Sequence, residues 1–129
     1  MFEPYIRAVG ATPALYMVWP TIDRVQYFDA VRDSYRAAAQ AVNGVFLPAG
    51  EAWVNAWARD STLQLYAWDG LHPSATGTYL AALVLYERIT GHDARRLPPR
   101  AVVQGQLLNL PEATVRLLQD AAHQANQEN

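Results

Sequence analysis

Two short runs of consecutive apolar residues, each ended by a proline, constrain the fold of this chain more than any other feature. The first covers residues 14–19 and is ended by Pro20, and the second covers residues 45–47 and is ended by Pro48. An unbroken apolar run of this length is typical of a strand buried on both faces, as in a parallel sheet. Between the runs, apolar residues recur every three or four positions over 25–38, which is the period of a helix. Strand, helix and strand in this order predict a parallel pair joined by a crossover helix.

Periodicity and turn residues predict further elements on either side of this unit. The expected elements are helices over 2–9, 51–57 and 74–90, a linker over 92–100, a hairpin over 102–108 and a last helix that begins at Pro111. Ser74 and Gly91 are the expected caps of the helix over 74–90, and the polar tail from residue 124 is expected to fray. The chain therefore divides into an α/β domain over 1–91 and an extension over 92–129 that packs on it.

The charge distribution argues against a nucleic-acid partner. Ten arginines and twelve acidic residues give a formal net charge of −2, and neither sign forms a run. The chain has no cysteine, and its histidines, at positions 72, 92 and 123, are scattered, so we expect no metal site and no cofactor. His92 and His123 are expected to be exposed and without a partner.

Nothing in the sequence has the pattern of a membrane or export segment. The first ten residues lack the basic end and apolar centre of a signal peptide, and the longest apolar stretch, around 79–86, is too short to span a bilayer. We expect a soluble chain, cytoplasmic as written and exported if a further N-terminal segment precedes it.

Asp69 and His72 lie three positions apart in the turn that leads into the helix over 74–90. Gly70 permits a tight turn, and Pro73 keeps the histidine out of the helical region. A carboxylate beside an imidazole fixes its tautomer and stabilises the imidazolium, as a general base requires when it takes a proton from a hydroxyl. Asp69 is therefore the candidate orienting group and His72 the candidate base. The spacing also fits an ordinary surface ion pair at a helix start, because Asp-Gly is a common turn.

The segment that holds this pair, DGLHPSATGTYLAALVLYERITG over residues 69–91, resembles the last signature block of the SGNH, or GDSL, hydrolases. In that family an Asp-x-x-His-Pro segment supplies two members of a Ser-His-Asp triad. The segments ALYMVWP and GVFLPAGEAW resemble late core strands of a bacterial branch of the family, and VVQGQLLNLP is similar to its C-terminal extension. The resemblance implies an esterase acting on a small-molecule ester, with Asp69 as the triad acid and His72 as the base.

The resemblance also implies that the chain matches only the C-terminal half of such a hydrolase. The family's serine block, oxyanion-hole glycine and asparagine block have no counterpart in this sequence. The implied fold is a partial three-layer αβα sandwich with a short parallel sheet and the N-terminal half missing. The strand over 14–19 then has an unpaired edge, and we expect a homo-oligomer, most simply a dimer, that pairs through it.

Three serines are the candidate nucleophiles, Ser34, Ser61 and Ser74. Ser34 falls within the helix predicted between the strands, and the other two occupy positions typical of turns and helix caps. A serine that lacks prepared oxyanion donors loses on the order of 3 kcal/mol of transition-state stabilisation per donor. We therefore expect weak activity or none from the chain alone.

Three tryptophans are candidates for the walls of a substrate pocket. Trp19 ends the first apolar run, Trp53 follows the second, and Trp68 directly precedes Asp69. Loops at the carboxyl ends of parallel strands are the usual ligand sites of α/β sheets, although tryptophans beside strands are also common core residues. Three functions stay open at this stage: an ester hydrolase, an inactive fragment that self-associates, and a small-molecule or glycan binding module that uses these tryptophans.

Overall fold

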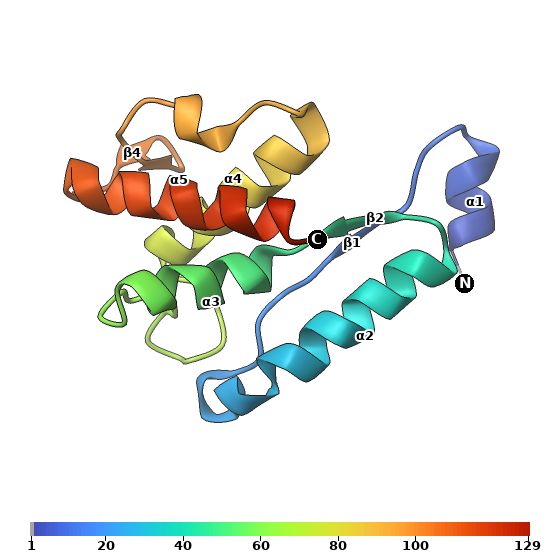
Figure 1. Ribbon diagram of the computed structural model, residues 1–129, viewed down its shortest axis with the longest axis horizontal. Coiled ribbons are helices and arrows are strands. Elements are labelled where there is room, and N and C mark those ends of the chain that lie inside the picture. Colours follow the sequence, from blue (N-terminus) through green and yellow to red (C-terminus); the bar gives the residue numbers. More distant parts are fainter. Residues whose placement is uncertain (1) are drawn as a thin grey trace.

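The computed structural model describes residues 2–129 (Figure 1). Its main sheet has two parallel strands, β1 (Ala14–Tyr16) and β2 (Val45–Leu47). The connection between them holds the 3₁₀ segment η1 (Ile22–Tyr27) and helix α2 (Phe28–Ala41), which contacts both strands. A short parallel sheet with helices packed against it confirms the predicted α/β class.

Strand β1 is shorter than the apolar run that predicts it. The register places Leu15 opposite Phe46, and the pairing ends where the Met17 amide donates to the carbonyl oxygen of Leu47 at 2.9 Å. Pro48 has no N–H, and helix α3 begins immediately after it, so the second half of the run has no strand to pair with. The chain therefore leaves the sheet after Met17.

Three helices form the body of the molecule. Helices α3 (Ala49–Arg59), α4 (Ala75–Thr90) and α5 (Glu112–Gln127) pack against one another, and α4 also contacts β2 (Figure 1). The helices predicted over 51–57 and 74–90 are confirmed. Because their apolar faces meet, these helices enclose the core, and burial of that surface is the main term that stabilises the fold. The largest fully buried side chains include Trp53, Met17, Leu65, Leu80 and Leu118.

Helix α4 begins and ends at the predicted caps. The Ser74 Oγ accepts a hydrogen bond from the Gly77 amide at 3.1 Å, and Gly91 ends the helix at a φ of +72°. Gly77 is also a point of very close approach, because a Cβ there would clash with the carbonyl oxygen of Leu65 and lie 2.7 Å from the ring of Trp53. The first turn of α4 thus packs directly on the backbone that precedes the turn at 66–73.

Residues 92–129 form a 3₁₀ turn, a small hairpin and α5, and α5 packs on α3 and α4. The 3₁₀ turn is η2 (Ala94–Arg96), and the antiparallel hairpin pairs β3 (Val102–Val103) with β4 (Gln106–Leu107), which confirms the predicted hairpin. Its two turn residues, Gln104 and Gly105, both have positive φ, as tight hairpin turns require. Helix α5 begins after Pro111, because that residue has the extended backbone of a capping position.

The prediction that the polar tail frays is wrong. Helix α5 continues to Gln127, and Asn126 is buried and donates to the carbonyl oxygen of Val84 at 3.2 Å. The Arg88 guanidinium donates to the main-chain oxygens of Asn126 and Asn129 at 3.0 and 2.7 Å. These bonds satisfy carbonyl groups that a helix end otherwise leaves without a partner.

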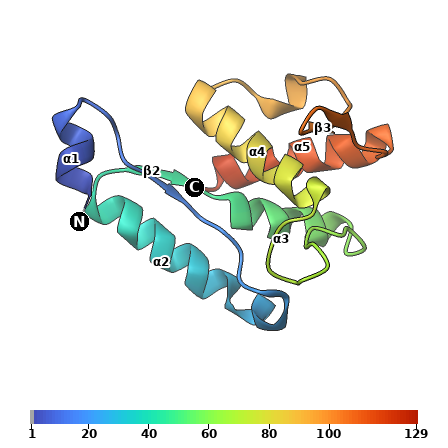
Figure 2. The ribbon, with the colours of Figure 1, turned by 180° about the vertical axis from the view of Figure 1, so that it is seen from behind.

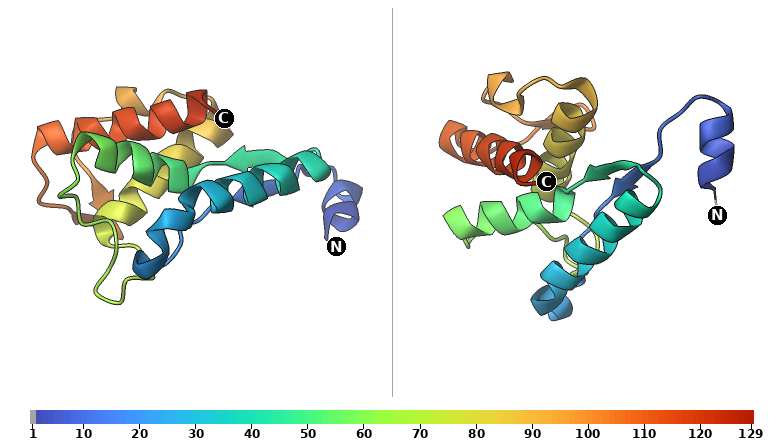
Figure 3. Two further views of the ribbon diagram at one scale, coloured as in Figure 1. Left: turned by 60° about the horizontal axis from the view of Figure 1, so that its bottom comes forward. Right: turned by 45° about the vertical axis from the view of Figure 1, so that its right-hand side comes forward.

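Helix α1 (Glu3–Ala8) stands apart from the three-helix body, at the far end of the strands (Figures 2 and 3). Arg7 joins it to the end of α2 by donating to the main-chain oxygens of Val42 and Asn43. Each strand of the main sheet keeps one edge without a partner strand among residues 2–129. Self-association through the free edge of β1 stays a prediction.

Within residues 2–129, no helix combines the length and the apolar character needed to cross a bilayer.

Candidate active site

The turn at 66–73 is held in place from both sides. Within the turn, the Ala67 amide donates to the carbonyl oxygen of His72 at 2.8 Å. Outside it, the Ile22 amide of η1 donates to the carbonyl oxygen of Gly70 at 2.8 Å. Gly70 has a φ of +66°, and a Cβ there would lie 2.5 Å from the Ile22 side chain, so both its backbone and its surroundings require glycine. The turn is consequently a preorganised element rather than a loose loop.

Asp69 and His72 meet within this turn as the sequence predicts. The Asp69 Oδ2 lies 2.6 Å from the His72 Nδ1, and the Asp69 Oδ1 accepts hydrogen bonds from the amides of Leu71 and His72, each at 3.0 Å. The hydrogen bond from His72, followed by the two backbone amides, lowers the pKa of Asp69 to about 2. The carboxylate is therefore ionised at any ordinary working pH.

The ionised carboxylate determines which nitrogen of the neutral imidazole carries the proton. A carboxylate only accepts hydrogen bonds, so the neutral ring carries its proton on Nδ1 and keeps a lone pair on Nε2. The His72 side chain is 72% exposed, whereas that of Asp69 is 26% exposed. Within residues 2–129, no hydrogen bond forms at Nε2. Such an arrangement can act chemically as an oriented general base.

An apolar groove of about 380 Å³ adjoins this histidine. It is lined by Tyr16, Val18, Trp19, Leu71, His72 and Pro73. The Trp19 Nε1 donates to the carbonyl oxygen of Leu71 at 3.1 Å, which fixes the indole beside the turn. Sequence reasoning places Trp19 at a pocket but misses Tyr16 and Leu71. The position of Leu71 between the two site residues is the one signal that could have indicated it.

The other two candidate tryptophans do not wall this groove, so the expectation that they do is wrong. Trp53 lies on α3 and is completely buried, because α4 packs against its ring at Gly77 and the ring stacks on Trp19 with centroids 3.7 Å apart. Trp68 is 98% exposed, so it packs against no other part of the molecule. The first is a core residue, and the second lies on the outside of the turn that holds Asp69.

None of the three serines hydrogen-bonds with His72 in the part of the chain that the structure describes. The Ser74 Oγ accepts from the Gly77 amide and donates to the carbonyl oxygen of Gln64 at 2.7 Å, so it is occupied as a helix cap. Ser34 lies on an exposed face of α2, and Ser61 follows the end of α3 beside a separate cavity. Within residues 2–129, therefore, no serine hydroxyl is hydrogen-bonded to the imidazole of His72.

Glu87, Asp93 and His123 form one cluster of groups that could ligate a metal, with ligand atoms within 4.8 Å of one another. The expectation that His123 is exposed and without a partner is wrong: its Nδ1 lies 2.8 Å from the Glu87 Oε1. The other Glu87 oxygen accepts from the Ala94 amide at 2.8 Å, and the Arg95 guanidinium binds Asp93 and holds the pKa of that carboxyl well below its usual range. These partners identify the cluster as a polar network that joins α5 to α4.

We predict that the His72→Ala substitution raises the pKa of Asp69 from about 2 toward its ordinary value, because the bond from His72 is the largest cause of the lowering. The lowered pKa stabilises the fold above the ordinary pKa, and this contribution disappears as the pH falls toward about 2. The measurement is a carbon-13 NMR titration of the aspartate carboxyl groups. Asp60 is the internal control, because the pKa of its carboxyl is lowered by Thr62 and does not depend on His72. An unmoved Asp69 midpoint would contradict the assigned contact.

Comparison with known proteins bears on the fold. No family model and no curated protein matches the sequence. Among solved structures, the chain is similar to the crystal structure of a DUF4886 family protein from Bacteroides uniformis, with a TM-score of 0.76 and 20% sequence identity. The match covers 95% of this chain and 51% of that protein, so the chain spans about half of its length. At this identity the likeness establishes that the two share a fold.

Proposed function

We propose that Asp69 and His72 form the acid–base half of an ester hydrolase site. The observation that carries the proposal is the 2.6 Å contact between the Asp69 Oδ2 and the His72 Nδ1, on a ring whose other nitrogen has no bond within residues 2–129. Backbone amides also hold ordinary turn carboxylates such as Asp60, but this pair has in addition two amides on one oxygen, an imidazole on the other and an adjoining apolar groove. This combination suits a base that acts on a bound substrate.

In the proposed reaction, the His72 Nε2 takes the proton of a hydroxyl as the hydroxyl oxygen attacks the ester carbonyl carbon. Asp69 stays ionised and stabilises the imidazolium that forms. When the tetrahedral intermediate collapses, the carbon–oxygen bond to the alcohol breaks and the imidazolium returns the proton to the departing alkoxide. Where the attacking hydroxyl belongs to a side chain, water then attacks the acyl group in the same way, the carboxylic acid is released, and the proton returns to that hydroxyl. The groove beside Trp19 receives the apolar part of the ester.

The hydroxyl nucleophile is proposed to come from another polypeptide segment. Ser74 is occupied as a cap, and neither Ser34 nor Ser61 contacts the histidine. Water takes the place of that hydroxyl in the chain alone, and without prepared oxyanion donors the reaction is slow. The proposal therefore predicts weak turnover that depends on His72.

The test is hydrolysis of p-nitrophenyl butyrate by the purified chain and by its His72→Ala variant. We expect turnover above the uncatalysed rate in the unchanged chain and its loss in the variant, because the variant lacks the base. The matched control is His92→Ala, which removes another exposed imidazole that bonds to no carboxylate within residues 2–129. Equal turnover in the unchanged chain and His72→Ala would contradict the proposal and favour an inactive fold.

A further inference from the structure

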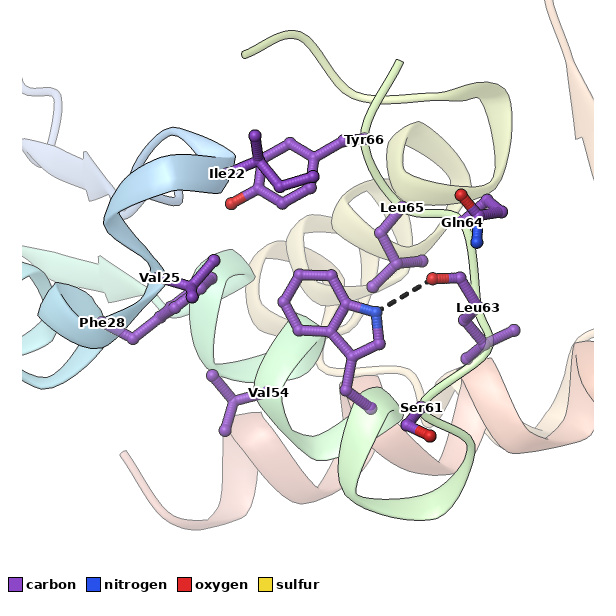
Figure 4. Close-up of a pocket in the computed structure, with 10 residues that line it drawn as sticks. Ile22, Val25, Phe28, Val54, Ser61, Leu63, Gln64, Leu65 and Tyr66 are labelled. Carbon is purple, nitrogen blue, oxygen red and sulfur yellow. Dashed lines mark hydrogen bonds between the residues drawn. The ribbon is translucent and has the colours of Figure 1, made fainter. Parts of the chain in front are cut away.

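A second apolar cavity, of about 500 Å³, lies between η1, α3 and the segment over 61–66 (Figure 4). Ile22 and Val25 of η1 and Phe28 of α2 line one side of it, and Leu63, Gln64 and Leu65 line the other. It shares no lining residue with the groove beside His72. The cavity is therefore a separate feature of the molecule, and the proposed hydrolase reaction makes no use of it.

The walls of this cavity are rigid and aromatic. The Trp57 Nε1 donates to the carbonyl oxygen of Leu63 at 3.0 Å, the bond drawn in Figure 4, and the Tyr66 hydroxyl donates to the carbonyl oxygen of Pro20. The rings of Trp57 and Tyr66 stack with centroids 5.9 Å apart, and Phe28 meets Trp57 edge-on. Since these side chains are held before any ligand arrives, binding costs little conformational entropy.

Large aliphatic side chains remain in contact with water around the opening. Ile22 is 58% exposed, Val25 44% and Val54 38%. Three such side chains gathered at one cavity are unlike isolated exposed apolar residues, which need no explanation. A ligand that covers them gains the free energy of removing apolar surface from water. The volume also falls within the range of about 300–1,000 Å³ that is usual for small-molecule sites.

The polar groups of the cavity are all neutral. None of its ten lining residues carries a formal charge, although 17% of the chain is charged. Burial raises the pKa of Tyr66 to about 12, so its phenol stays neutral as well. Ser61 and Gln64 supply a hydroxyl and an amide on the side formed by the segment over 61–66. A charged ligand would lose its water here without gaining an opposite charge.

We infer that this cavity binds a neutral amphiphilic small molecule, with an alkyl body against Trp57 and a hydroxyl or amide head beside Ser61 and Gln64. A medium-chain alcohol is the simplest representative of this class. The inference stands independently of ester hydrolysis, because it depends on none of the residues of the His72 groove.

The experiment is a titration of the nitrogen-15-labelled chain with 1-octanol, followed through the four tryptophan indole N–H signals, with Trp57→Phe used to assign one of them. We expect the Trp57 signal to shift saturably and sodium octanoate to bind at least about tenfold more weakly, because its carboxylate must lose water. Val54→Asn should weaken octanol binding at least about tenfold. Val18→Asn is the matched control, since Val18 has almost the same exposed fraction, 37% against 38%, but lines the other groove.

Three results would overturn the inference: no saturable shift of the Trp57 signal, octanoate binding as tightly as octanol, or equal weakening by the two asparagine variants. A shift of the Trp19 signal without one at Trp57 would place octanol in the His72 groove and would also count against it. The folded state of each variant is read from the dispersion of the same spectra.

Discussion

The Asp69→Asn variant is expected to hydrolyse p-nitrophenyl butyrate about 10²- to 10⁴-fold more slowly than the unchanged chain. The reason is that the two carboxylate oxygens of Asp69 have different hydrogen-bond partners. The Oδ1 accepts from the amides of Leu71 and His72, and the Oδ2 faces the imidazole Nδ1. In asparagine, the single carbonyl oxygen stays with the two backbone amides, so the NH₂ group faces Nδ1 and donates to it. The ring proton then moves to Nε2, and that nitrogen loses the lone pair with which it accepts a proton.

This variant changes the tautomer of His72 without changing the structure of the turn. The turn keeps both backbone hydrogen bonds in Asp69→Asn, whereas an alanine substitution would remove them together with the carboxylate. Nitrogen-15 chemical shifts of the imidazole report which nitrogen carries the proton. Asp60→Asn is the matched control, because that carboxylate also accepts bonds from its own turn but bonds to no histidine among residues 2–129. An unchanged rate in a folded Asp69→Asn variant would show that Asp69 does not orient the base.

The pH dependence of turnover follows from the same contacts. The pKa of Asp69 is lowered to about 2, so this group is fully ionised throughout an assay between about pH 4 and 9. A loss of activity on the acid side of that range therefore does not come from protonation of Asp69. We expect Asp69 to cause no acid step above about pH 3.

The Asp69–His72 pair is visible in the sequence because all of its determinants are local. The acid, the glycine that permits the turn and the proline that ends it lie within five consecutive positions, so spacing and turn chemistry predict the contact. The groove beside it is not predictable in this way. Tyr16 comes from β1, more than fifty positions earlier, and only the packed fold brings it to the histidine.

The same distinction separates the tryptophans at the two strand ends. Trp19 and Trp53 each follow an apolar run, and sequence position alone treats them alike. In the structure one lines a groove and the other is fully buried, because Gly77 allows α4 to approach the ring of Trp53 closely. The prediction that His123 has no partner is wrong for the same reason, since its partner Glu87 lies 36 positions away on another helix.

In the fold, the order of helices and strands follows from periodicity, whereas the length of β1 does not. A continuous run of apolar residues predicts a strand over 14–19, but a strand ends where its partner ends. Pro48 terminates β2, so Val18 and Trp19 are released from the sheet and become lining residues of the His72 groove. Val18 and Trp19 belong to the apolar run that predicts a longer strand, but in the structure they line the His72 groove instead.

Replacing Gly77 with alanine is expected to lower the free energy of unfolding by about 2 kcal/mol, against the direction that helix propensity predicts. In an open helix, glycine to alanine stabilises by about 1 kcal/mol. Here the added methyl group would clash with the carbonyl oxygen of Leu65 and lie 2.7 Å from the Trp53 ring. The oxygen has no freedom to retreat, because it accepts from the Ser74 amide at 2.8 Å. Overpacking of this kind costs about 1–3 kcal/mol and sometimes more, which outweighs the propensity gain.

The measurement is urea unfolding of the unchanged chain and of Gly77→Ala, with Thr78→Ala as the matched control. Thr78 is exposed on the same turn of α4, so alanine there should change the stability little or raise it slightly. The sign of the Gly77→Ala effect therefore tests the close packing of α4 on Leu65 rather than helix formation. Because that packing also anchors the start of the turn at 66–73, a stabilised Gly77→Ala variant would remove the structural reason for the fixed positions of Asp69 and His72.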